Sequence, residues 1–144
     1  MLKTIRVAKI REEGILPRRK NHTDAGIDFY APYDIMLYPH EVKVINTLIS
    51  VEIPEGYMLL IKPKSSNNHL VGAGVIDAYY HPGPIMVKLV NPTNETLVYR
   101  RGAGIAQGIF IKVETPEIEE VSIEDLKTEH PRSGDGGILR QSGG

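Results

Sequence analysis

The chain contains no cysteine among its 144 residues. It therefore cannot form a disulfide, use a thiolate as a nucleophile or hold a metal through sulfur, although this absence does not decide the compartment. Its five histidines are scattered and show neither His-x-x-His nor His-Glu-x-x-His spacing. Nothing in the sequence indicates a zinc site.

Excess charge and long apolar runs are also lacking. The formal net charge is -1, which gives no general attraction to nucleic acid or to a membrane surface. No apolar run approaches the roughly 18 residues that a spanning helix needs. The first eleven residues also lack the apolar core of a signal peptide. We therefore expect a cytoplasmic protein with no membrane or direct nucleic-acid partner, in which any recognition of anions is local.

Short runs rich in β-branched and aromatic residues dominate the rest of the chain, and long amphipathic helices are absent. They are separated by turn signals such as Pro-Glu-Gly at 54–56 and Asn-Pro-Thr-Asn at 91–94. This spacing predicts an all-β, jelly-roll-like β-barrel or sandwich with one core. The expected strands are 5–10, 27–30, 35–38, 42–45, 48–53, 57–61, 70–76, 85–90 and 105–113.

The C-terminal part of the chain differs from this pattern. One short helix is expected from Ser122 to Lys127, where Ser122 can cap and Asp125 lies at the third helical position. The polar, glycine-rich residues that follow cannot bury enough apolar surface to order themselves. We therefore predict a β domain over residues 1–127 and a flexible C-terminal segment over residues 128–144.

A glycine-rich turn between two apolar runs brings a carboxylate and an aromatic side chain close in sequence. Glycines in the segment 71–80 allow close approach of the backbone to a ligand, and the strand-like run that follows ends at Asp77. Apolar residues alternate over 85–90, so the two runs are expected to form a broad hairpin whose mouth carries Asp77 and Tyr80. Taken alone, a glycine-rich turn with an aspartate at the end of a strand is more often ordinary turn chemistry than a catalytic site.

Five short segments follow one another along the chain: Asp-Ala-Gly-Ile-Asp at 24–28, Pro-Lys-Ser-Ser at 63–66, Gly-Val-Ile-Asp at 74–77 with Tyr80, Gly-Ala-Gly-Ile-Ala-Gln at 102–107, and the arginine- and glycine-containing tail at 132–144. Together they resemble the five motifs of the trimeric dUTPases, and the third is the most specific match. The resemblance extends from Asp24 to the end of the sequence.

This resemblance implies hydrolysis of dUTP to dUMP and pyrophosphate, which limits uracil in DNA. It also implies that Asp77 orients and activates the water that attacks the α-phosphate. Asp28 would lie near a Mg2+ ion, which it binds through water, and Gln107 would donate a hydrogen bond to the phosphates. The family resemblance further implies a homotrimer in which each site for the small-molecule substrate dUTP is shared among subunits.

The resemblance also implies a set of residues that bind the substrate: Lys64, Ser65, Ser66, Val71, Gly74, Tyr80, Arg132 and Ile138. The lysine and the two serines would contact the phosphates, and the backbone of 71–74 would read the uracil edge. The tyrosine ring would pack on the deoxyribose and leave no room for a 2′-hydroxyl. The two tail residues would close over the bound nucleotide.

Three features depart from the family pattern. Lys64 stands where arginine is usual, so the bidentate fork is lost. Gly102-Ala103-Gly104 replaces Gly-Asp-Arg, and Ile138 replaces an aromatic residue. Two alternatives therefore stay open. One is a non-catalytic dUTPase-like module that senses nucleotides or binds a protein. The other is a dCTP deaminase-like enzyme, although Lys88 stands where that enzyme needs a glutamate.

Overall fold

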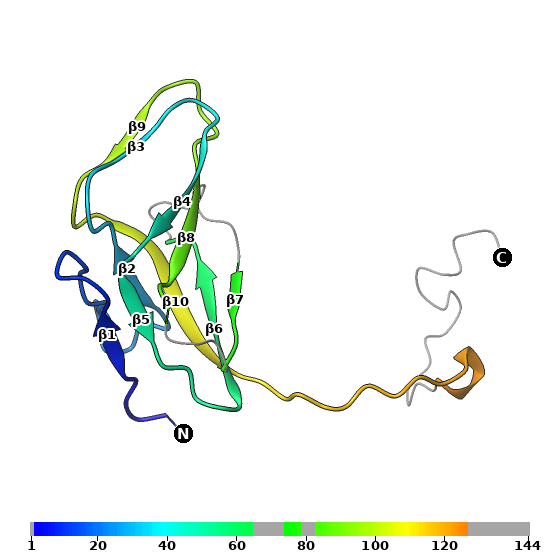
Figure 1. Ribbon diagram of the computed structural model, residues 1–144. Coiled ribbons are helices and arrows are strands. Elements are labelled where there is room, and N and C mark those ends of the chain that lie inside the picture. Colours follow the sequence, from blue (N-terminus) through cyan, green and yellow to red (C-terminus); the bar gives the residue numbers. More distant parts are fainter. Residues whose placement is uncertain (1, 65–73, 79–82, 127–144) are drawn as a thin grey trace. The chain divides into compact units, whose positions relative to one another are not determined.

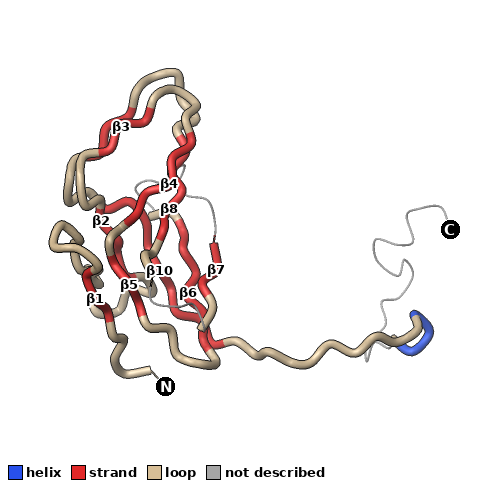
Figure 2. Tube along the Cα trace, in the orientation of Figure 1, coloured by secondary structure: helices blue, strands red, loops and turns tan. Residues whose placement is uncertain are grey.

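The computed structural model describes residues 2–64, 74–78 and 83–126, and divides the chain into two units, Met1–Glu114 and Thr115–Gly144. The described part of the first unit is built from strands (Figures 1 and 2). These strands are β1 (Val7–Lys9), β2 (Ile27–Tyr30), β3 (Ile35–Leu37), β4 (Val42–Asn46), β5 (Ile49–Val51), β6 (Tyr57–Lys62), β7 (Gly74–Ile76), β8 (Met86–Val90), β9 (Leu97–Tyr99) and β10 (Gly104–Lys112).

The strands pair in one sheet of four and three ribbons of two. The larger sheet has the order β2-β10-β6-β7, and the ribbons are β1-β5, β3-β9 and β4-β8. Every pairing is antiparallel. Figure 1 shows the β3-β9 ribbon at one end of the unit, with the β4-β8 ribbon between it and the larger sheet. The all-β, jelly-roll-like architecture expected from the sequence is confirmed.

Alternation along the strands explains how the core forms. In β8, Val87 and Leu89 are fully buried while Met86 and Lys88 are exposed, because successive side chains point to opposite faces. The same alternation buries Ile35 and Leu37 in β3. The core is lined by Phe29, Ala31, Ile35, Leu37, Ile45, Ile49, Val51, Ile53, Leu59, Ile61, Ile85, Val87, Leu89, Ile105 and Ala106.

An irregularity in β10 breaks the alternation at one place. Gly104 lies opposite Tyr30 and Ala106 lies opposite Phe29, so β10 has an extra residue, Ile105, at this point. Ile105 and Ala106 are consequently both buried. A bulge of this kind changes which face the following side chains occupy. Beyond it, Gln107 lies directly opposite Asp28.

Three details of the fold differ from the sequence-based expectation. The described strand β7 pairs with β6 and β8 pairs with β4, so the expected hairpin between the two runs is wrong. The strand β9 was not expected. The expected helix is only a 3-10 turn, η2 (Ile123–Asp125), and Ser122 makes no side-chain capping hydrogen bond. Apolar alternation fixes which face of a strand is buried, but it does not identify the partner strand.

Asn91, in the predicted turn after β8, is a fully buried polar residue. Its side-chain amide donates to the carbonyl oxygens of Leu37, Tyr38 and Glu95 at 3.0, 3.1 and 2.7 Å. Its side-chain oxygen accepts from the Thr93 backbone amide at 2.9 Å. This one side chain therefore ties the end of β3 to the turn that leads into β9.

Replacing Asn91 by alanine is expected to lower the free energy of unfolding by about 3 kcal/mol, since several buried polar groups lose their partners at once. Urea unfolding at neutral pH measures the loss. The matched control is Asn94→Ala in the same turn; among the described residues, the Asn94 side chain bonds only to the exposed His40 ring. A loss no larger for Asn91→Ala than for this control would contradict the assigned role.

Asp34 connects the turn before β3 to the residues after β9. The backbone amide of Arg101 donates to its carboxylate at 2.8 Å, and the Arg100 guanidinium lies 3.4 Å from the other oxygen. The Arg101 hydrogen bond, helped by Arg100, lowers the pKa of Asp34 below its ordinary value.

Because the pKa of Asp34 is lower in the folded than in the unfolded state, the carboxylate stabilises the fold above its unfolded pKa. That contribution is lost as the pH falls through the folded pKa. Asp34→Asn is therefore expected to lower the urea midpoint at neutral pH and to have no effect at the acid end of a pH series. A difference from wild type that is constant with pH would contradict this linkage.

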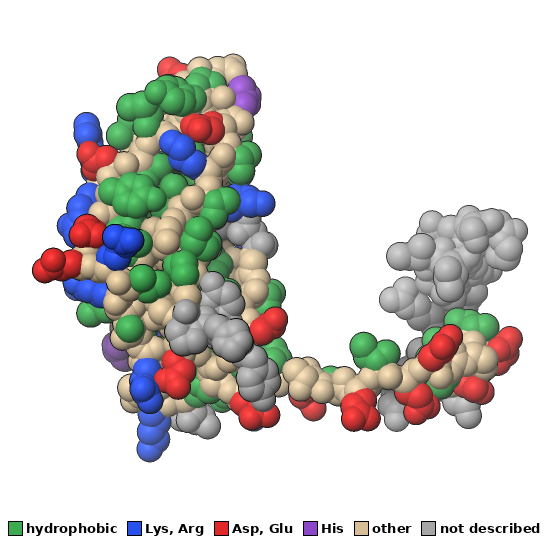
Figure 3. Space-filling view, in the orientation of Figure 1, with side chains coloured by type: hydrophobic (Ala, Val, Ile, Leu, Met, Phe, Trp, Pro, Cys, Tyr) green, Lys and Arg blue, Asp and Glu red, His purple; other side chains and the backbone are tan. Residues whose placement is uncertain are grey.

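The described part of the second unit, residues 115–126, is acidic and carries exposed apolar side chains. It contains Glu117, Glu119, Glu120, Glu124 and Asp125 and no lysine or arginine. Figure 3 shows these acidic side chains beside apolar ones, and Ile118 is fully exposed. In the ranges 2–64, 74–78 and 83–126, no helix has the length and apolar character needed to cross a membrane.

Candidate functional site

The register of the larger sheet gathers polar side chains on one face. Gln107 in the middle of β10 pairs with Asp28 of β2 on one side and with Lys62 of β6 on the other. Side chains of directly opposed residues lie on the same face of a sheet. The side chain of Phe29 points to the other face and is buried in the core. Asp28 and Gln107, far apart in sequence, are therefore neighbours.

A small pocket of about 360 Å³ lies over this face and is lined by Lys20, Asp24, Ala25, Gly26, Asp28, Lys64 and Gln107. Lys64 follows the end of β6 and its ammonium lies 2.7 Å from the carboxylate of Asp28. The two side chains are only 21% and 16% exposed, so the pair is screened less than a surface ion pair. The Gln107 amide donates to the Pro63 carbonyl oxygen at 2.9 Å, which fixes the backbone next to Lys64.

Two glycines leave space for these side chains. A methyl group on Gly26 would collide with the side-chain oxygen of Gln107. One on Gly104 would lie 3.0 Å from the Lys64 ammonium. The aliphatic stem of Lys64 thus lies where a side chain at position 104 would otherwise project. An ammonium, an amide and a carboxylate on one half-enclosed face can bind a phosphate group and a cation that accompanies it.

Asp77 lies elsewhere in the same chain. Strand β7 pairs with β6 so that Gly74 lies opposite Ile61 and Ile76 lies opposite Leu59. Asp77, which directly follows β7 and is exposed, is therefore at the level of Met58. Lys62 is four residues further along β6, which corresponds to about 13 Å. The chain by itself brings together Asp28, Lys64 and Gln107 but keeps Asp77 away from them.

The remaining residues predicted from the sequence lie outside the described part of the structure. These are Ser65, Ser66, Val71, Tyr80, Arg132 and Ile138. The structure also places in the pocket two residues that were not predicted as site residues, Lys20 and Asp24. Lys20 lies outside the motif at 24–28, and no pattern in the sequence around it indicates that it lines the same pocket as Lys64.

The donor set of this pocket bears on metal binding. In the ranges 2–64, 74–78 and 83–126, no group of three or more histidine, aspartate or glutamate residues is arranged so that it could hold a metal ion. Of the two aspartates that line the pocket, Asp28 lies beside the Lys64 ammonium, and Asp24 accepts hydrogen bonds from Asn21. Such a site fits Mg2+ held mainly by substrate phosphates and water, with Asp28 acting through water, because Mg2+ keeps several of its waters.

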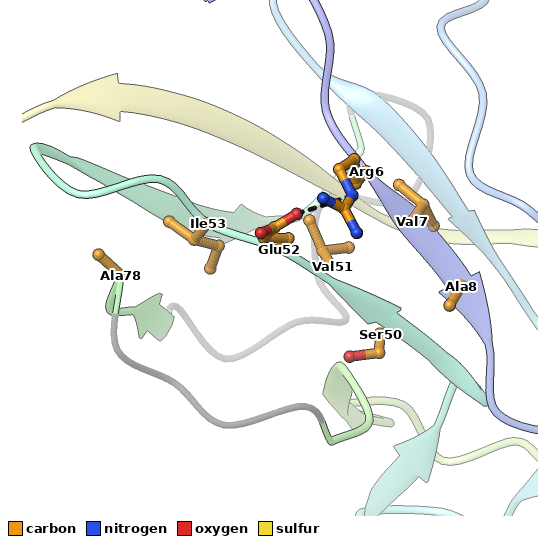
Figure 4. Close-up of a pocket in the computed structure, with 8 residues that line it drawn as sticks. All are labelled: Arg6, Val7, Ala8, Ser50, Val51, Glu52, Ile53 and Ala78. Carbon is orange, nitrogen blue, oxygen red and sulfur yellow. Dashed lines mark ion pairs between the residues drawn. The ribbon is translucent and has the colours of Figure 1, made fainter.

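A second hollow, of about 460 Å³, lies against strands β1 and β5 (Figure 4). Its two charged residues, Arg6 and Glu52, pair with each other at 3.1 Å. Ala78, the neighbour of Asp77, lines its far side in the close-up. The remaining lining is small or apolar, so this hollow offers a ligand little charge beyond the Arg6–Glu52 pair.

The fold and the pocket define an all-β domain with a phosphate-compatible pocket at one end of its larger sheet. The family model of the dUTPases matches residues 12–138. The chain belongs to the dUTPase family.

Individual relatives agree with this assignment. The deoxyuridine 5′-triphosphate nucleotidohydrolase of Mycolicibacterium vanbaalenii is 36% identical over 142 residues, covering 93% of this chain and 92% of the relative. A mutant dUTPase of S. aureus phage phi11, solved to describe a structural Mg(II) ion, has a TM-score of 0.77 and 29% identity, covering 85% of this chain and 99% of that one. A mutant dUTPase of Staphylococcus bacteriophage 80alpha, solved with dUpNHpp, has a TM-score of 0.76 and 28% identity, and the match covers 94% of this chain and 98% of that one.

Proposed function

We propose that this protein hydrolyses dUTP to dUMP and pyrophosphate by attack of water at the α-phosphate, a reaction that limits uracil in DNA. The observation that carries the proposal is the dUTPase family match over residues 12–138. The phosphate-compatible pocket supports the proposal, because it brings together Asp28, Lys64 and Gln107 from the first, second and fourth of the five motifs.

The pocket residues act on the phosphates. Transfer of a phosphoryl group requires positioning and charge neutralisation more than covalent chemistry. Lys64 supplies positive charge, and Gln107 is already held by the Pro63 carbonyl oxygen. An amide fixed in this way loses little freedom on meeting a phosphate oxygen. Because Lys64 is paired with Asp28 in the free protein, nucleotide binding must exchange that partner for a phosphate.

Mg2+ is the proposed cofactor. When bound, it neutralises charge on the phosphates. Asp28 would hold it through water, next to the phosphates that provide its direct ligands. Release of the Lys64 ammonium to the phosphates would leave the Asp28 carboxylate available for this role.

The position of Asp77 supports a site shared between chains. This carboxylate is proposed to orient and activate the attacking water, which requires hydrogen-bond reach of it. Within one chain, Asp77 lies about 13 Å along β6 from the pocket end of that strand. In a homotrimer, Asp77 of one subunit would lie at the pocket of the next subunit, which would bring the carboxylate within reach of the phosphates. Gly74, Val71 and Tyr80 would reach the uracil and the sugar from the same subunit as Asp77.

The proposal is tested by pyrophosphate release from dUTP, dCTP, dTTP and UTP in the presence of Mg2+. We expect rapid release from dUTP alone. Ammonia release from dCTP would instead support the deaminase alternative, for which Lys88 offers no carboxylate. Binding of dUTP without turnover, in a correctly assembled oligomer, would support the nucleotide-sensing alternative.

The segment 128–144 is proposed to close over the bound nucleotide through Arg132 and Ile138, together with Ser65 and Ser66 on the phosphates. Deleting residues 132–144 is then expected to lower kcat/KM for dUTP by about a factor of 100, since closure excludes water and completes the contacts. Size-exclusion chromatography should show an unchanged oligomer. Unchanged turnover after the deletion would exclude the lid role.

A further inference from the structure

The charged side chains that line the pocket differ in whether they already have a hydrogen-bond or ion-pair partner. Two lysines and two aspartates are present: Lys20, Lys64, Asp24 and Asp28. Lys64 and Asp28 neutralise each other at 2.7 Å. The carboxylate of Asp24 accepts hydrogen bonds from the backbone and side-chain amides of Asn21 at 3.0 and 3.2 Å. Within the part of the chain that the structure describes, Lys20 has no hydrogen bond or ion pair.

The backbone around Lys20 is held in place although its side chain is exposed. The Arg19 guanidinium donates to the Asp24 carbonyl oxygen at 2.6 Å, and the Asp24 amide donates to the Asn21 carbonyl oxygen at 2.9 Å. These bonds close the turn that contains Lys20.

This turn is also anchored to the sheet. The backbone groups of Arg18 and Asp28 exchange hydrogen bonds of 3.2 and 2.7 Å. Lys20 therefore lies two residues after Arg18, which pairs with Asp28 of the pocket. The position of Lys20 in the lining of the pocket therefore follows from this anchored turn.

We propose that Lys20 is a phosphate-binding residue of this site, one that contacts the polyphosphate of the bound nucleotide. The inference rests on the proposed function. A polyphosphate brings several negative charges, and the net charge of the two lysines and two aspartates is zero. Within the part of the chain that the structure describes, Lys20 supplies a cation with no direct ion-pair partner, whereas Lys64 is already paired with Asp28. A compact ammonium with three donors on a flexible stem suits contact with phosphate oxygens whose positions change during the reaction.

The test compares ligands with and without phosphates in Lys20→Met. Calorimetric titration with dUpNHpp and Mg2+, and NMR titration with deoxyuridine, measure binding without turnover. We expect affinity for dUpNHpp to fall about tenfold, the range for loss of one charge-assisted hydrogen bond. Affinity for deoxyuridine should stay unchanged. In turnover, KM for dUTP should rise while kcat changes little, because the contact exists before the reaction.

Two further variants sharpen the result. Lys20→Arg should retain most of the affinity for dUpNHpp, because the charge and the donors are kept. Lys112→Met, an exposed lysine at the far end of β10, controls for loss of one surface charge. Equal loss in Lys20→Met and Lys112→Met would overturn the proposal. The proposal would also be overturned if Lys20→Met lowered only the association rate of dUpNHpp and high salt abolished the difference. That result would show that Lys20 attracts the ligand electrostatically without contacting it.

The outcomes separate this inference from the function on which it rests. Wild type that fails to bind dUpNHpp would reject the proposed function itself. Wild type that binds it, with Lys20→Met binding equally well, would reject only the role of Lys20. Thermal melting of each variant verifies folding, which substitution of an exposed side chain should leave unchanged.

Discussion

Asp77→Asn is expected to lower kcat for dUTP hydrolysis by about a factor of 1,000, the scale of losing a positioned general base. The amide cannot take a proton from the attacking water, although it has nearly the same shape. Affinity for dUpNHpp should change little, because the proposed role of Asp77 concerns the water. Pyrophosphate release and calorimetric titration of the same preparation measure the two quantities.

The control for this change is Glu55→Gln. Glu55 is an exposed carboxylate in the turn before β6, at the end of that strand near which Asp77 lies. Its removal alters the local charge equally but is expected to leave kcat unchanged. Comparable losses in both variants would show that Asp77 acts only through its charge, and retained turnover in Asp77→Asn would exclude it as the base.

Two variants that are inactive alone are expected to restore activity when they assemble together. Asp77→Asn removes the carboxylate that activates the water, and Asp28→Asn removes a carboxylate of the pocket. In a trimer that contains both kinds of chain, one of the three sites combines an intact Asp77 with an intact Asp28. Mixed trimers should therefore recover about a third of wild-type turnover, as the ring symmetry requires. This is an increase of about 100-fold or more over the Asp77→Asn parent, whose loss is that of a positioned general base.

Co-expression with two different affinity tags, followed by purification on both in series, isolates the mixed oligomers. Mixing the separately purified parents just before the assay is the control and should give no recovery. Mixed trimers that remain as inactive as their parents would contradict a shared site and would require Asp77 to reach the pocket of its own chain.

Most strands could be predicted because apolar alternation is a local property. The expected strand 27–30 is identical to β2, and 85–90 differs from β8 by one residue. The strand β9 was missed because Leu97–Tyr99 is short and only half-buried. The expected helix at 122–127 is a single 3-10 turn over Ile123–Asp125, whose residues are all exposed and so lack the buried apolar face that stabilises a helix in a protein.

The candidate site shows the same division. Asp28, Lys64 and Gln107 were recognised through the motifs they belong to, and the structure places all three at one pocket. Lys20 was missed because only the hydrogen bonds of its turn bring it there. The expected hairpin carrying Asp77 was wrong because β7 and β8 pair with other strands.

By itself, the sequence determined the all-β class, the faces buried along each strand and the residue types of the motifs, because each follows from local pattern and composition. Only the tertiary structure decided which strands pair, where the bulge in β10 directs Gln107, and that Asp77 lies apart from Asp28 and Lys64. Strand pairing joins residues distant in sequence, and its register sets which side chains share a face. A one-residue shift would reverse the face of every side chain in the strand.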